Sequence, residues 1–220
     1  MSVPKMVLFD LDGTLVDTAP DLTLALNLQR ERHGLPPLAL EIVRPHASHG
    51  SRGLLGIGFG LAPEHERFPA MREEYLALYD EVFTRSPQMF DGIAEVLEAL
   101  EDAGIRWGVV TNKPRRFTRP LLAVMGLSTR AACIVSGDDA ARPKPHPDTL
   151  LLACALAGGA NPQSCIYVGD AERDIQAGQA AGMRTIVARY GYIDAYERPD
   201  AWGASSIIAE PRELLEQLSL

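Results

Sequence analysis

The sequence contains little that is typical of a membrane or secreted protein. No apolar run reaches the ~18 residues from which a membrane-spanning helix is predicted. The first ten residues, MSVPKMVLFD, carry one lysine and a short apolar run that ends at Asp10. This pattern matches neither a signal peptide nor a membrane anchor. We therefore expect a cytoplasmic protein without a membrane partner.

Cysteine and net positive charge are also scarce. The cysteines are odd in number, form no C-x-x-C pair and lie among apolar residues, which predicts reduced thiols in the core. They are Cys133, Cys154 and Cys165. Lysine and arginine, 21 in all, are outnumbered by 29 aspartate and glutamate residues, and the formal net charge is −8. Because nucleic-acid binding needs a basic surface, this balance argues against a nucleic-acid partner.

The chain does contain enough apolar material for a large core, since 46% of its 220 residues are hydrophobic. From Pro87 onward, strand patterns alternate with helix patterns. The predicted strands are RWGVVT, ACIV, SCIYVGD, RTIVA and SSIIA, separated by helices such as GIAEVLEALEDAG, DTLLLACALAG and ERDIQAGQAAG. Such alternation predicts an α/β fold, a Rossmann-like parallel sheet core with helices on both faces.

One segment interrupts this alternation. DLTLALNLQRERHG and EHERFPAMREEYLALYDEVFTRS have the spacing of amphipathic helices, with no strand between them. We interpret residues 18–86 as an inserted helical cap domain. Residues 1–17 and 87–220 then form the α/β catalytic core.

Polar side chains follow three of the predicted strands. A first strand is predicted over residues 7–9, and Asp10 and Asp12 follow it. Thr111 ends the next core strand, and Asp170 follows SCIYVG. Open parallel sheets place their sites at the carboxyl ends of strands. If the first strand is central and the other two flank it, these side chains converge above one crevice. Lys144, held between two prolines in RPKPHP, joins them from a stiffened loop.

The aspartates in these clusters predict a magnesium site. Asp10 and Asp12 are two residues apart, so an extended backbone projects both to one side, where like charges repel. With Asp170 and Asp174 they offer oxygen ligands without nearby His or Cys, which favours Mg²⁺ over zinc. Mg²⁺ usually takes one or two carboxylates plus water and phosphate, so not all four need be direct ligands.

These residue types suit phosphoryl transfer. An ionised aspartate beside the metal can act as a nucleophile and form an aspartyl-phosphate. Lys144 and the Thr111 hydroxyl would hold the phosphoryl oxygens. Asp12 is then free to protonate the leaving oxygen and later to activate water. The expected substrate is a small phosphorylated metabolite.

Four stretches together resemble the ordered motifs of the haloacid dehalogenase-type phosphatases. They are DLDGTLVDT, VVTNK, the Lys144 loop RPKPHP and VGDAERD. The likeness is greatest to the phosphoglycolate phosphatase branch, which includes N-acetylmuramic acid 6-phosphate phosphatases. It implies Mg²⁺ as cofactor, Asp10 as nucleophile and Asp12 as acid/base, with the Asp12 backbone carbonyl on the metal. It implies that Asp170 is a metal ligand and that Asp174 either binds the metal or contacts a residue that does.

The resemblance also assigns residues that bind substrate. Thr111, Asn112 and Lys144 would bind phosphate. The stretch SHGSRG, residues 48–53, is similar to the loop with which relatives contact the leaving group, and this makes His49, Ser51 and Arg52 candidates for substrate specificity. Arg52 would meet a distal carboxylate or second phosphate, or else is a surface arginine beside a helix start.

Other interpretations stay open. A hexose-phosphate mutase would share the same core, and a phospho-aspartate signalling module would share the Asp, Thr and Lys clusters, but would need no cap. A dehalogenase would have no use for the metal-binding aspartates. We expect Asp17 and Thr18 to form the N-cap of the first helix of the cap domain rather than contact the site. We expect GIGFG, residues 56–60, to be a loop or part of the cap domain rather than a nucleotide-binding motif. The assembly is expected to be a monomer or homodimer.

Overall fold

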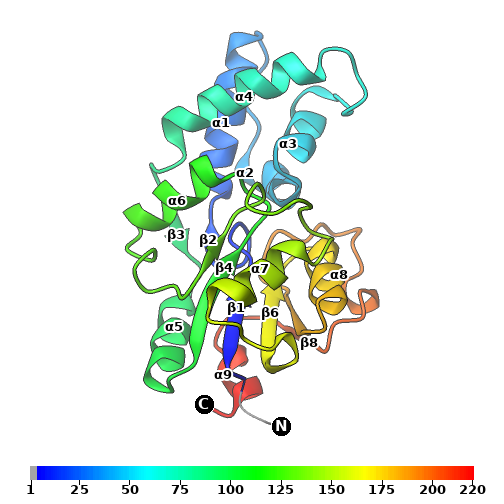
Figure 1. Cartoon of the computed structure of the whole chain (residues 1–220). Coiled ribbons are helices and arrows are strands. Elements are labelled where there is room, and N and C mark those ends of the chain that lie inside the picture. Colours follow the sequence, from blue (N-terminus) through cyan, green and yellow to red (C-terminus); the bar gives the residue numbers. More distant parts are fainter. Residues whose placement is uncertain (1–3) are drawn as a thin grey trace.

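The computed structural model describes residues 4–220, in which six strands form one parallel sheet (Figure 1). The strands are β1 (Met6–Phe9), β4 (Arg106–Val110), β5 (Ile134–Val135), β6 (Cys165–Gly169), β7 (Arg184–Ala188) and β8 (Ser206–Ile208). Their order is β5-β4-β1-β6-β7-β8. The predicted position of the first strand is confirmed, because β1 pairs with β4 on one side and β6 on the other.

Helices cover both faces of this sheet, as the alternating pattern predicts. They are α5 (Ile93–Asp102), α6 (Arg115–Val124), α7 (Asp148–Leu156), α8 (Glu172–Ala180) and α9 (Glu213–Leu218). Successive side chains of β1 point to opposite faces. Val7 and Phe9 join an apolar cluster with α5, α6 and α9, whereas Met6 and Leu8 join another with α7 and α8. The expected α/β fold is therefore confirmed.

Residues 18–86, between β1 and β4, are mostly helical, and Figure 1 shows the helices α1 to α4 grouped at the upper edge of the sheet. They contain α1 (Ala19–Arg32), α2 (Leu40–Val43), a 3₁₀ helix η1 (Arg44–His49), α3 (Gly50–Phe59) and α4 (Phe68–Val82). These helices share a third apolar cluster. We call residues 18–86 the helical insert. Its status as a domain with those boundaries stays a prediction.

Two short strands that the sequence patterns do not reveal join the helical insert to the sheet. β2 (Val16–Asp17) and β3 (Gln88–Met89) pair antiparallel, with Val16 opposite Met89 and Asp17 opposite Gln88. The chain therefore leaves and re-enters the sheet layer at one place.

The glycine-rich stretch GIGFG lies in the helical insert and is mostly helical rather than a loop. Its first four residues belong to α3, which ends at Phe59. The glycines allow close packing rather than a turn, since a Cβ on Gly58 would lie 2.6 Å from Leu26 Cδ1 of α1. Ser51 and Arg52 also lie in the first turn of α3 rather than in a loop.

Two further expectations can be compared with the structure. All three cysteines are buried and unpaired with one another in disulfides, as predicted. Within residues 4–220, every helix is too short or too polar to cross a bilayer.

Candidate active site

The predicted convergence at the carboxyl ends of the strands is present. Asp10 directly follows β1, Thr111 follows β4 and Asp170 follows β6. All three are buried, with at most 3% of each exposed. Because β1 lies between β4 and β6 in a parallel sheet, these ends meet at one edge.

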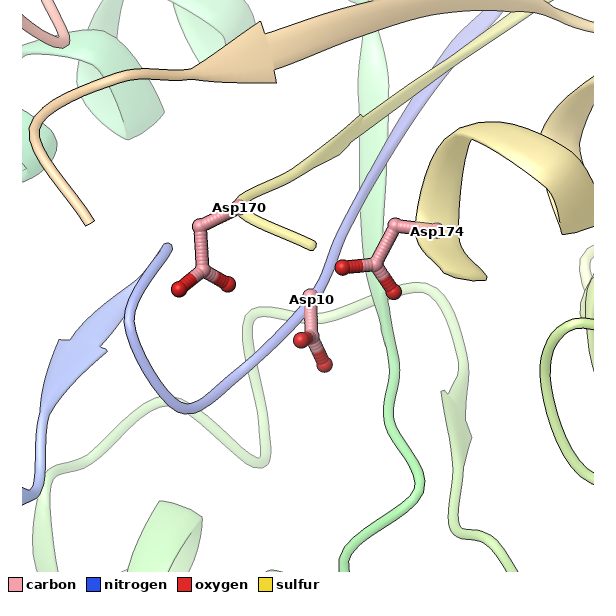
Figure 2. A group of neighbouring side chains, drawn as sticks. All are labelled: Asp10, Asp170 and Asp174. Atoms are coloured by element: carbon pink, nitrogen blue, oxygen red, sulfur yellow. The ribbon is translucent and has the colours of Figure 1, made fainter. Parts of the chain in front are cut away.

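Three carboxylates form a tight cluster at this edge. Asp10, Asp170 and Asp174 each offer an oxygen within 4.8 Å of the others, and Figure 2 shows their carboxylates gathered around one region. Burial raises the pKa of Asp10. Burial, followed by the nearby charges of Asp10 and Asp174, raises the pKa of Asp170 to about 7. A hard divalent cation would relieve this repulsion, so the donor set fits Mg²⁺.

The Lys144 ammonium lies against two of these carboxylates. Its Nζ is 2.9 Å from Asp10 Oδ1 and 2.7 Å from Asp174 Oδ1. It also donates to the Tyr167 hydroxyl at 2.7 Å. Burial disfavours the charged amine, but Asp10 and Asp174 outweigh burial and raise the pKa of Lys144. Lys144 is therefore a buried amine beside Asp10 whose charged form is stabilised by the two carboxylates.

Asn112 holds the loop that carries this lysine. Its Nδ2 donates to the Lys144 carbonyl oxygen, and its Oδ1 accepts from the Lys144 backbone N–H, both at 2.9 Å. The side chain amide of Asn112, which was expected to bind phosphate, therefore contacts the loop through both its nitrogen and its oxygen. Thr111 Oγ1 accepts from the Lys113 backbone N–H at 3.1 Å. Both residues line the adjoining cavity, where binding to a phosphate stays a prediction.

The Asp12 carboxylate lies outside the three-carboxylate cluster found among residues 4–220. Its Oδ1 is 2.9 Å from Lys113 Nζ and accepts a hydrogen bond from the Thr18 hydroxyl. Lys113 in turn donates to the Tyr79 hydroxyl at 2.8 Å. Lys113 and Tyr79 are absent from the sequence-predicted set, although Lys113 belongs to the VVTNK motif.

The backbone turns at Gly13, directly after Asp12. Its φ of +87° is unfavourable for residues with a side chain. A Cβ at this position would lie 2.2 Å from Asp170 Oδ2. Both the backbone conformation and the lack of space therefore require glycine at position 13.

Thr18 differs from its predicted role. It occupies the N-cap position of α1, but its side chain makes no capping hydrogen bond and instead reaches Asp12. The first turn of α1 is capped by other groups: the Ala19 backbone N–H donates to Asp17 Oδ1 at 3.3 Å and to the Tyr192 hydroxyl at 2.9 Å. The expectation for Asp17 as a cap is met. That for Thr18 is wrong, because its hydroxyl donates to Asp12 and accepts no hydrogen bond from a helix N–H.

The helical insert closes one side of the site. Ser48 Oγ donates to Asp170 Oδ2 at 2.7 Å, and Arg173 Nη2 of α8 donates to the Ser48 carbonyl oxygen at 2.6 Å. Neither Ser48 nor Arg173 was predicted, although Ser48 lies in the SHGSRG stretch. The contacts depend on how the insert packs on the sheet, which no local pattern indicates.

A cavity of about 480 Å³ lies between the sheet edge and the helical insert. Asp10, Asp12 and Lys144 line its inner end. The three predicted specificity residues, His49, Ser51 and Arg52, also line the cavity. Arg72 of α4 lines it as well. Leu22, Tyr75, Leu76, Tyr79 and Phe117 form an aromatic and apolar part of the remaining wall, which also includes Lys113 and Arg173.

The model of the haloacid dehalogenase-like hydrolases matches residues 7–188, a span that includes every motif described above. The chain belongs to this family. An N-acetylmuramic acid 6-phosphate phosphatase from Pseudomonas aeruginosa is 43% identical over 214 residues, covering 97% of this chain and 94% of that protein. A phosphoglycolate phosphatase from Xanthomonas campestris is 41% identical over 216 residues, covering 98% and 97%.

This haloacid dehalogenase-like hydrolase is also similar in structure to a solved protein. A predicted phosphoglycolate phosphatase from Haemophilus somnus superposes with a TM-score of 0.84 at 26% identity, covering 99% of both chains. The expectations of family membership and of an enzyme of the phosphatase class are confirmed.

Proposed function

We propose that the protein is a Mg²⁺-dependent phosphatase for the phosphate monoester of a small carboxylic acid. The observation that carries this proposal is the pairing of a buried carboxylate, Asp10, with the Lys144 ammonium 2.9 Å away at the inner end of the cavity. One group is suited to attack phosphorus and the other to stabilise phosphoryl oxygens.

The residues divide the reaction into two steps. In the first, an Asp10 oxygen bonds to phosphorus while the ester P–O bond breaks, and Asp12 donates a proton to the departing oxygen. In the second, Asp12 takes a proton from water, which attacks phosphorus and releases phosphate from Asp10. Lys144 and the Thr111 hydroxyl hold the phosphoryl oxygens throughout.

The three clustered carboxylates, Asp10, Asp170 and Asp174, would hold the metal, and we retain the Asp12 backbone carbonyl as a further ligand. When bound, Mg²⁺ would offset negative charge on the carboxylates and phosphoryl group. Ser48, Thr14 and the Tyr192 backbone N–H orient the Asp170 carboxylate, which accepts from all three at 2.7–3.2 Å. Such outer contacts fix ligand position.

The outer end of the cavity supports a carboxylate on the substrate. Arg52 and Arg72 both line it, and both are exposed. Arg72 Nε donates to Ser51 Oγ at 3.3 Å, and among residues 4–220 no carboxylate pairs with either guanidinium. Two guanidinium groups without an anionic partner in the protein are suited to bind the carboxylate of a substrate.

Cavity size favours the larger of the two substrates that the relatives' names provide. A ligand site usually encloses most of its ligand. Phosphoglycolate, with two carbons, would leave much of a 480 Å³ cavity to water. A muramic acid 6-phosphate would place its sugar ring against Tyr75, Tyr79 and Phe117, and its lactyl carboxylate near the outer arginines.

The test is a comparison of three phosphate esters with Mg²⁺ present. We expect kcat/KM to be highest for N-acetylmuramic acid 6-phosphate, and lower for phosphoglycolate and for N-acetylglucosamine 6-phosphate, which lacks the lactyl group. Arg52→Gln or Arg72→Gln should lower kcat/KM for the muramic ester by roughly ten- to hundred-fold, the scale of a lost hydrogen bond to a charged group. Steady-state kinetics of phosphate release measures each value.

The glucosamine ester serves as the matched control, because it cannot present a carboxylate to either arginine. Its kcat/KM should change by less than about fivefold in both variants, as for an exposed charge without a partner. Equal losses on both sugars would refute the carboxylate subsite. Absence of turnover on all three esters would refute the proposed substrate class.

Asp12→Asn should separate acid/base work from metal binding. The Asp12 side chain lies outside the carboxylate cluster, so the Mg²⁺ concentration that gives half-maximal activity should stay unchanged. Hydrolysis of an alkyl phosphate should slow by about 10²–10⁴-fold, as for a lost acid/base. The loss in the first step should shrink for an aryl phosphate, whose leaving group needs little protonation. The pre-steady-state burst of released alcohol measures that step.

A large drop in Mg²⁺ affinity, or equal slowing of the first step for both esters, would show that Asp12 is not the acid.

A further inference from the structure

Tyr192 lies in the loop that follows β7, and it contacts the candidate metal cluster through its backbone. Its N–H donates to Asp170 Oδ2 at 2.9 Å. The residue is only 1% exposed, so these contacts are shielded from water. No motif of the sequence points to it.

The hydroxyl of the same residue contacts the start of the helical insert. It accepts hydrogen bonds from the backbone N–H groups of Thr18 at 2.7 Å and Ala19 at 2.9 Å. It donates to Asp17 Oδ1 at 2.7 Å. The first N–H groups of a helix have no partner within the helix, and here a side chain from the sheet layer supplies one. Residues 17–19 are therefore fixed by a group more than 170 positions away in the chain.

These residues also carry the contact to Asp12. The Thr18 hydroxyl donates to Asp12 Oδ1, so the position of the Thr18 backbone sets one of the two partners of that carboxylate. Arg44 reinforces the arrangement, because its guanidinium binds both Asp17 oxygens at 2.9 and 3.0 Å and lies 5.6 Å from the Tyr192 ring centre.

We infer that Tyr192 is a positioning residue for the reaction, which aligns the Asp12 carboxylate with the Asp170 carboxylate. Its backbone N–H positions the Asp170 carboxylate. Its hydroxyl positions Thr18, which in turn positions the Asp12 carboxylate. Tyr192 itself does not contact the substrate. This inference rests on the proposed role of Asp12 as acid/base.

Tyr192→Phe removes the hydroxyl and keeps the ring and the N–H that binds Asp170. We expect kcat on an alkyl phosphate to fall about ten- to hundred-fold, as for a misplaced catalytic group. The burst on an aryl phosphate should change much less, because that step depends little on Asp12. The Mg²⁺ concentration for half-maximal activity should stay unchanged, since the Asp170 contact is retained.

Tyr190→Phe is the matched control. It lies two residues away, and its hydroxyl donates to the Thr14 carbonyl oxygen at 3.0 Å rather than to residues 17–19. It should lower the melting temperature as Tyr192→Phe does, yet leave kcat on both esters unchanged. A loss of kcat in Tyr190→Phe equal to that in Tyr192→Phe would overturn the inference, because stability alone would then explain both.

A double-mutant cycle gives a stricter test. If Tyr192 acts through Asp12, adding Tyr192→Phe to the Asp12→Asn variant should not lower kcat any further. Full additivity of the two losses would overturn the inference. Should Tyr192→Phe fail to fold, Thr18→Val tests the same link: it should lose activity on the alkyl ester selectively, while Thr18→Ser, which keeps the hydroxyl, should not.

The two hypotheses fail in different ways. If Asp12→Asn slows both esters equally, the acid assignment fails, and the inference fails with it. If Asp12→Asn shows the expected selectivity but Tyr192→Phe and Thr18→Val do not, the proposed function stands and the inference alone is overturned.

Discussion

Asp10→Asn should reduce turnover by at least about 10⁴-fold, the largest effect that we expect from a single substitution. The amide keeps the shape of the side chain but cannot attack phosphorus. Acid quenching of the native enzyme with radiolabelled substrate should trap label on the protein in a form that hydroxylamine removes. The variant should trap none.

The fold should survive this change, because the amide keeps the size and shape of the side chain and the Lys144 ammonium keeps its ion pair with Asp174 at 2.7 Å. Circular dichroism and the melting temperature check this point. Multiple turnover by a variant preparation that is free of contaminating phosphatase would exclude Asp10 as the nucleophile.

Removal of divalent metal should have an effect of similar size. After treatment with a chelator and desalting, we expect activity to fall to background and to return on addition of Mg²⁺, because three buried carboxylates otherwise repel each other and the phosphoryl group. Titration of the metal-free enzyme with Mg²⁺, followed by phosphate release, measures the recovery.

A binding measurement makes this prediction independent of catalysis. A ligand that binds only the folded state raises the melting temperature. Mg²⁺ should therefore raise the melting temperature of the native protein, and should do so much less for Asp170→Asn, which loses one of the three clustered charges. Full activity after rigorous metal removal would contradict the magnesium hypothesis.

The geometry around Asp10 could be predicted because it follows from strand order. A buried run that ends in Asp10, and two further runs that end in polar residues, place side chains together once the sheet is parallel and β1 is central. The local patterns of these strands are unambiguous, since side chains on both faces of β1 are buried. Strand order also places Lys144 at this edge of the sheet, because its loop leads from the carboxyl end of β5 into α7.

The contacts between the sheet and the helical insert could not be predicted. Ser48, Lys113 and Tyr192 are ordinary polar residues in the sequence, and they become part of the site only when distant segments pack together. The helical conformation of the glycines in α3 could not be predicted for a related reason. Glycine within a helix costs stability, and the gain at Gly58 comes from close contact with Leu26, which is 32 positions earlier.

The antiparallel pairing of β2 with β3 has an evolutionary consequence. Asp17 and Gln88 lie opposite each other, so the two ends of the helical insert are neighbours and the intervening segment can change in length or sequence without displacing the strands beside it. Asp10 and Asp170 follow β1 and β6, and Asp174 lies on α8. Arg52, Arg72 and most of the aromatic wall belong instead to the helical insert. Duplicated genes can thus diverge in the compound they process while inheriting the same phosphoryl chemistry.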